Sequence, residues 1–304
     1  MRFALTAIAF CLLLNLHTTV RADAQLNVVV SVKPLHALVL GVMQGVASPA
    51  LLLDSTQSPH QASLRPSDMR TLSKADLVFW IGPQLETFMP RVLHTLKPGT
   101  SIVSLMDNPH LALLPQRGTH AHNDEPANHE PDTAPVDPHI WLSTRNADLM
   151  VEHIAQTLIK LDPVHTAEYS RNAKHMHLQI DKLRQQITSK LKKTTKKFIS
   201  YHDAYQYFEN EFGLQNAGVV AQGDELQPSA HHIRELRQQI RQQDITCVVY
   251  DAPRRPAIIN TLLSGTSASA VELDALGLKH PQGSQTWFEL VRTLADNLST
   301  CLGN

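Results

Sequence analysis

The sequence has 304 residues, with 27 Lys and Arg against 28 Asp and Glu, and a formal net charge of −1. Such a balance provides no basic stripe for nucleic acid or acidic lipid, so neither is expected as a partner. Beyond the first residues, no segment approaches the ~20 apolar residues of a membrane span. The length exceeds one domain of ~100–150 residues, so we expect two domains.

Residues 1–24 have the pattern of a cleavable signal peptide. A basic start at Arg2 precedes an apolar run too short to cross a bilayer, and a small-residue site ends at Ala24. We predict cleavage after Ala24 and export of the mature chain. Cys11 follows Phe10 rather than the small residue that a lipid-attachment cysteine needs, so it is expected to leave with the signal.

The first half of the mature chain alternates β-rich runs with helical patterns, as in a mainly parallel sheet covered by helices. We predict an N-terminal α/β lobe over residues 25–162. Its predicted strands cover residues 26–32, 50–53, 77–81 and 101–104, and its predicted helices cover 35–44, 66–75, 85–94 and 146–161.

Residues 108–138 interrupt this alternation. They are rich in Pro, Asp, Glu, Asn and His, and we predict a mobile surface loop. Farther along, an apolar periodicity predicts a linking helix over 163–193. At ~1.5 Å per residue this helix would extend about 45 Å, which is long enough to brace two lobes.

Residues 194–304 repeat the alternation and predict a second α/β lobe. Its strands are predicted at 198–201, 217–221, 246–250 and 270–273, and its helices at 204–211, 230–242, 257–263 and 285–302. The expected fold is therefore α/β with two lobes. Each lobe is a mainly parallel sheet covered by helices, and one long helix joins them.

Two cysteines follow the signal segment, Cys247 and Cys301. In an oxidising compartment an even pair favours a disulfide, to which the chain-entropy model assigns roughly 4 kcal/mol for so long a loop. Two unrelated buried thiols are the alternative at this point.

Histidine is abundant, with 17 in the chain. His60 follows a predicted strand, His139 ends the 108–138 loop, and His202 directly follows another predicted strand. Asp274 likewise follows a strand. Open α/β sheets bind ligands beyond the carboxyl ends of their strands, and neutral imidazole is a preferred ligand of Zn²⁺. The placement fits a metal site in the cleft between the lobes, and it also fits ordinary surface or core histidines.

Longer motifs are more specific than this placement. They are SPHQASLRPSD at 58–68, ADLVFWIGP at 75–83, HIWLS at 139–143, HDAYQYFE at 202–209, LQP at 226–228 and LDALG at 273–277. Over essentially the whole mature chain, the sequence resembles the periplasmic zinc-binding component of high-affinity zinc ABC importers (ZnuA-type), within the metal-binding cluster of solute-binding proteins.

The resemblance implies a site and a function. His60, His139 and His202 would be the zinc ligands, and Asp274 matches a carboxylate position that serves as a fourth ligand in the family, with a water as the alternative fourth ligand. It also implies a Cys247–Cys301 disulfide. The protein would be a monomeric periplasmic carrier rather than an enzyme, delivering Zn²⁺ to the membrane permease of an ABC importer.

The loop before His139 departs from the family pattern. Zinc-binding members often carry a long loop dense in His and acidic residues, whereas this chain offers three histidines there: His120, His122 and His129. We expect weak metal capture by them, with a simple solvated linker as the alternative.

Three other functions are alternatives. One is manganese binding by a member of the same family: the resemblance implies that manganese-binding members carry a carboxylate where this chain has His202, and Mn²⁺ favours oxygen ligands. A zinc hydrolase would need a general base near a metal-bound water, for which Asp203 and Glu225 are weak candidates. A surface adhesin built on the fold would need an anchor, which the sequence does not show.

Overall fold

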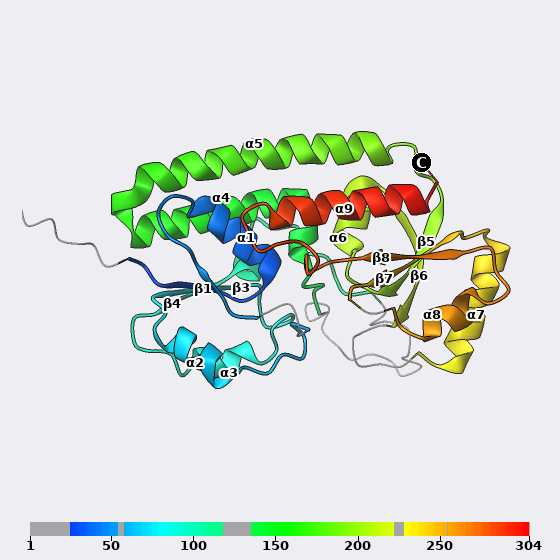
Figure 1. Ribbon diagram of the computed structural model, residues 1–304, viewed down its shortest axis with the longest axis horizontal. Helices are drawn as coiled ribbons and strands as arrows, with labels where there is room; N and C mark the ends of the chain where they lie inside the picture. Colours follow the sequence, from blue (N-terminus) through cyan, green and yellow to red (C-terminus); the bar gives the residue numbers. More distant parts are fainter. Residues whose placement is uncertain (1–24, 54–57, 118–134, 222–227, 254, 304) are drawn as a thin grey trace, which may run out of the picture.

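The computed structural model describes residues 25–53, 58–117, 135–221, 228–253 and 255–303 (Figure 1). The predicted signal segment 1–24 and the histidines His120, His122 and His129 lie outside the described residues. Within the described ranges, no helix has both the length and the apolar composition needed to cross a membrane.

The N-terminal lobe contains a four-stranded parallel sheet in the order β2-β1-β3-β4. Val29 of β1 packs into one hydrophobic cluster, whereas Val28 and Val30 pack into another. Both faces of the strand are therefore buried, which explains its unbroken run of valines. The elements of this lobe are β1 (Val28–Val30), α1 (Lys33–Val42), β2 (Ala50–Leu51), α2 (Pro66–Ser73), β3 (Leu77–Trp80), α3 (Met89–Leu93) and β4 (Ser101–Ser104).

The C-terminal lobe repeats this design with a parallel sheet in the order β6-β5-β7-β8. Phe198 and Ile199 of β5 point into different hydrophobic clusters, so this central strand is also buried on both faces. The elements are β5 (Lys197–His202), α6 (Gln206–Phe212), β6 (Gln215–Ala221), α7 (Ala230–Gln242), β7 (Cys247–Asp251), α8 (Ile258–Leu263) and β8 (Ser269–Leu273).

Long helices join the two lobes. Figure 1 shows α5 (Thr166–Leu191) running over both sheets, with α9 (Thr286–Cys301) beside it and α4 (Thr144–Leu161) under its first half. The inner face of α5 carries a stripe of buried side chains at spacings of three and four residues. These are Tyr169, Ala173, Met176, Ile180, Leu183, Ile187 and Leu191. This stripe belongs to a hydrophobic cluster that contains both Val30 of β1 and Val249 of β7. The two sheets therefore share one continuous core.

The predicted fold class is confirmed, and the differences lie at element ends. Helix α5 begins at Thr166 because Pro163–His165 forms a separate 3-10 turn. Helix α3 starts at Met89 rather than at residue 85, because the backbone N–H groups of Leu85 and Glu86 close a turn onto the carbonyl of Gly82.

The predicted disulfide is present between Cys247, the first residue of β7, and Cys301, the last residue of α9. It fastens the end of the last helix to a central strand of the second sheet. The alternative of two separate thiols is wrong.

We predict that replacing both cysteines with Ser lowers the free energy of unfolding by about 4 kcal/mol, because the unfolded chain then regains the entropy of an open loop. Denaturant unfolding of the variant and of the oxidised protein measures this difference. Thiol titration of the unfolded, unreduced protein should find no free thiol, and two reactive thiols would contradict the bridge.

Candidate metal centre

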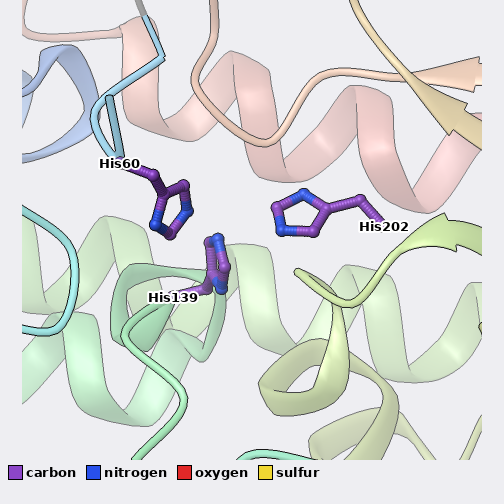
Figure 2. A group of neighbouring side chains, drawn as sticks. All are labelled: His60, His139 and His202. Atoms are coloured by element: carbon purple, nitrogen blue, oxygen red, sulfur yellow. The ribbon is translucent and has the colours of Figure 1, made fainter. Parts of the chain in front are cut away.

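Three imidazoles converge between the two sheets. His60, His139 and His202 each offer one ring nitrogen, and these three atoms all lie within 4.8 Å of one another. Their ring centroids are 5.4 Å (His60–His139), 5.8 Å (His60–His202) and 5.1 Å (His139–His202) apart. Figure 2 shows the three rings facing a common point from three separate segments of the chain.

Each histidine is placed by a different local structure. His202 is the last residue of β5 and so lies at the carboxyl edge of the second sheet. His60 lies in the connection between β2 and α2, where its carbonyl oxygen accepts a hydrogen bond of 3.2 Å from the Thr87 hydroxyl. His139 immediately precedes a 3-10 turn, Ile140–Leu142.

The ring of His139 is oriented by a buried carboxylate. One oxygen of Asp137 accepts hydrogen bonds from the His139 ring nitrogen Nδ1 at 2.7 Å and from its backbone N–H at 3.0 Å. Asp137 and His139 are 2% and 5% exposed. With Nδ1 engaged in this way, Nε2 is the nitrogen that His139 can offer to a metal ion.

A second carboxylate lies behind His202. An Asp251 oxygen is 3.9 Å from Nδ1 of His202, and the other oxygen accepts a hydrogen bond from the Tyr205 hydroxyl. Burial, with the negative charge of Asp251, raises the pKa of Tyr205 well above its ordinary value. The phenol therefore stays protonated and keeps donating to Asp251.

Asp274 does not join the group of three histidines in the structure. One of its oxygens accepts from the backbone N–H of Lys279 at 2.9 Å. The other, Oδ1, is buried and has no hydrogen-bond partner. A buried carboxylate oxygen without a hydrogen-bond partner has lost its hydration without replacement, so a cation or a water bound to it would stabilise it.

Two further buried groups support the site, and neither stands out in the sequence. Lys33, at the start of α1, donates a 2.6 Å hydrogen bond to the carbonyl of His280 and so fastens the segment after Asp274 to the first lobe. Burial lowers the pKa of Lys33, and the charge of Asp274 opposes that change.

Glu86 is the other such group. Its carboxylate accepts from the backbone N–H groups of Ile81 (3.1 Å) and Gly82 (3.0 Å) and from the Ser31 hydroxyl, so it ties together the segments that follow β1 and β3. Burial raises its pKa to about 7, although the three donors favour the ionised form. Its neighbour Thr87 holds the backbone of His60.

The donor set suits zinc. Three neutral imidazoles with one further position complete the tetrahedron that Zn²⁺ prefers, whereas Mn²⁺ favours more oxygen ligands. A fourth position left to water or a carboxylate is typical of zinc sites that exchange a ligand.

Comparison with known sequences identifies relatives over about nine-tenths of the chain. The family described as zinc-uptake complex component A, periplasmic, matches residues 28–301. The high-affinity zinc uptake system protein ZnuA of Brucella abortus is 36% identical, over 91% of each chain. The protein of the same name from Yersinia pestis is 30% identical, over 92% of each chain.

Solved structures show the same fold at lower sequence identity. The solute-binding protein FpvC of Pseudomonas aeruginosa, in complex with Ni²⁺, superposes with a TM-score of 0.77 at 21% identity, over 92% of this chain and 97% of that one. Laminin-binding protein of Streptococcus agalactiae, described as an adhesin with metal-transporting activity, gives 0.77 at 23%, over 92% and 100%.

We predict that Asp137→Ala weakens zinc binding by about 10- to 100-fold, the range typical of residues that hydrogen-bond a ligand imidazole. The His139 ring would lose the acceptor that fixes its orientation and its tautomer. Competition with a chelator of known affinity measures the change. Asp181→Ala, which removes a carboxylate with 48% side-chain exposure on α5, is the matched control. Equal affinity in both variants would show that Asp137 does not orient the ligand.

Proposed function

This chain belongs to the ZnuA family of periplasmic zinc-uptake components, and from that premise we propose that it captures Zn²⁺ at His60, His139 and His202 and delivers it to the membrane permease of an ABC importer. The convergence of three imidazoles within 4.8 Å is the observation that carries this proposal. The ion is cargo, so the protein acts by binding and release.

The ligand chemistry supports zinc over manganese. All three side chains that converge are nitrogen donors, and the position that would bear a carboxylate in a manganese site is occupied by His202. Two relatives that match over 91% and 92% of this chain are named high-affinity zinc uptake system proteins.

A hydrolase is less well supported than a carrier. A general base must be able to reach a metal-bound water. The carboxylate of Asp203 instead accepts hydrogen bonds from Arg117, and Glu225 lies outside the described residues.

Other features complete the proposal. The mature chain would begin after Ala24 and act in the periplasm as a monomer, and its lobes and linking helix would have the predicted bounds 25–162, 163–193 and 194–304. Asp274 or a water would supply the fourth ligand. The buried, unpartnered oxygen of Asp274 supports the carboxylate. His120, His122 and His129 would capture metal weakly.

The test is metal selectivity and its dependence on the three histidines. We expect protein purified without added metal to contain about one zinc, and Zn²⁺ to displace Mn²⁺ in competition. Changing His60, His139 or His202 to Ala should weaken zinc binding by more than the ~100-fold upper end for ligand-supporting residues, because each removes a coordinate bond. His175→Ala, at an exposed position of α5, is the control. Wild-type affinity in all three variants would sink the proposed site.

The pH dependence of binding gives an independent check. An imidazole binds a metal only when neutral, and its ordinary pKa is ~6.5. Protons therefore compete with zinc, and affinity should fall steeply as the pH drops from 7.5 to 5.5. With three imidazoles the slope should exceed that of a single-proton competition. Titration calorimetry at several pH values measures the slope, and a flat profile is incompatible with a three-histidine site.

A further inference from the structure

A short two-stranded stalk stands beside the metal centre. It consists of residues 114–117 and 135–137, with a bridge between Pro115 and Val136. The backbone N–H of Gln116 donates to Pro135 at 2.8 Å, and that of Asp137 donates to Leu114 at 2.9 Å. The second strand of the stalk thus carries Asp137, which orients His139.

The stalk is fastened to helix α6. The Tyr207 hydroxyl accepts from the backbone N–H of Leu114 at 3.1 Å and donates to the carbonyl of Asp137 at 2.7 Å. The amide of Gln206 donates to the carbonyl of Pro115 at 2.9 Å. Because α6 follows β5 closely, the stalk lies against the segment that carries His202.

Arg117 links these segments through ion pairs. Its Nε lies 2.9 and 3.1 Å from the two oxygens of Asp203, its second terminal nitrogen also contacts Asp203, and its Nη1 donates to Glu209 at 2.7 Å. The side chains of Asp203 and Glu209 are 10% and 6% exposed, and that of Arg117 is 33% exposed. One guanidinium thus serves two nearly buried carboxylates.

The link leads directly to a predicted ligand, because Asp203 is the residue after His202. Glu209 extends it, since its other oxygen accepts from Asn216 at 2.8 Å, and Asn216 also donates to the Ser200 hydroxyl at 2.8 Å. Arg117 therefore connects the stalk, which orients His139, to the residues on either side of His202: directly to Asp203, and through Glu209 and Asn216 to Ser200. Only a planar guanidinium can hold Asp203 through two nitrogens and still reach Glu209.

We propose that Arg117 is a positioning residue that sets zinc affinity and release by holding His202 in register with His139; this inference rests on the proposed function. Without Arg117, two buried carboxylates would lack their cation and would have to rearrange. Asp203 would then move, and the adjacent backbone of His202 with it.

The direction of the change in zinc affinity when Arg117 is removed distinguishes a positioning role from a purely electrostatic one. A nearby positive charge repels Zn²⁺, so its removal would on electrostatic grounds tighten binding. Positioning predicts the opposite. It also predicts that Lys, which keeps the charge but lacks the planar fork, cannot replace Arg117.

The experiment compares Arg117→Gln and Arg117→Lys with Arg171→Gln, a change at an exposed arginine of α5. Zinc affinity is measured by chelator competition and the dissociation rate by stopped flow. We expect both Arg117 variants to bind about 10- to 100-fold more weakly, mainly through faster dissociation, and the control to match the wild type. Unchanged or tighter binding in Arg117→Gln would overturn the proposal.

A stability control and a double-mutant cycle complete the test. The variant without the disulfide loses stability at the end of β7 opposite the metal centre, so its zinc dissociation rate should match that of the wild type.

If Arg117→Gln does not fold, the zinc affinities of Arg117→Lys and Asp203→Asn provide the test instead. The double variant Arg117→Lys/Asp203→Asn should bind zinc no more weakly than whichever single variant binds it more weakly. If the losses of zinc-binding free energy in the two single variants add fully in the double variant, the coupling is overturned. Weak zinc binding by the wild type would instead refute the proposed function itself.

Discussion

The candidate metal centre depends on a fixed distance between two separate sheets. His60 follows a strand of the first sheet and His202 ends a strand of the second, yet their ring centroids lie 5.8 Å apart. Hydrophobic packing supplies this constraint, because α5 and α9 bury their inner faces in one core that both sheets share. Two indole N–H groups add directional links: Trp141 donates to the carbonyl of Ala275 at 2.8 Å, and Trp287 donates to the carbonyl of Trp141 at 2.9 Å.

Within that frame, polar groups set the finer geometry. Asp137 fixes the ring of His139, Thr87 holds the backbone of His60, and Asp251 lies behind His202. A misplaced imidazole in an apolar surrounding would coordinate poorly and would also leave a polar atom unsatisfied. The chain therefore places a polar or charged side chain next to each of its three candidate ligands.

The spacing of apolar residues predicts the two sheets and the long helix, because strands and helices each have a characteristic apolar spacing that is local in sequence. The strand-end rule selects His60, His202 and Asp274 as candidates, but it does not show that Asp274 lies outside the group of histidines. Lys33 and Arg117 escape sequence reasoning altogether, because their partners lie far along the chain, at His280 and at Asp203 and Glu209. An isolated Arg in a polar stretch looks like any surface charge until the fold brings two buried carboxylates to it.

A carrier must release its ion as well as hold it, and the geometry addresses both needs. In the proposed site three imidazoles hold the ion and the fourth position is left to Asp274 or a water, whereas structural zinc sites are closed by four protein ligands. Because His60 follows a strand of the first sheet and His202 ends a strand of the second, a relative movement of the two sheets would separate these two candidate ligands. The contacts that hold the segments in register, including the Arg117 link to Asp203, would then determine how readily the ion leaves.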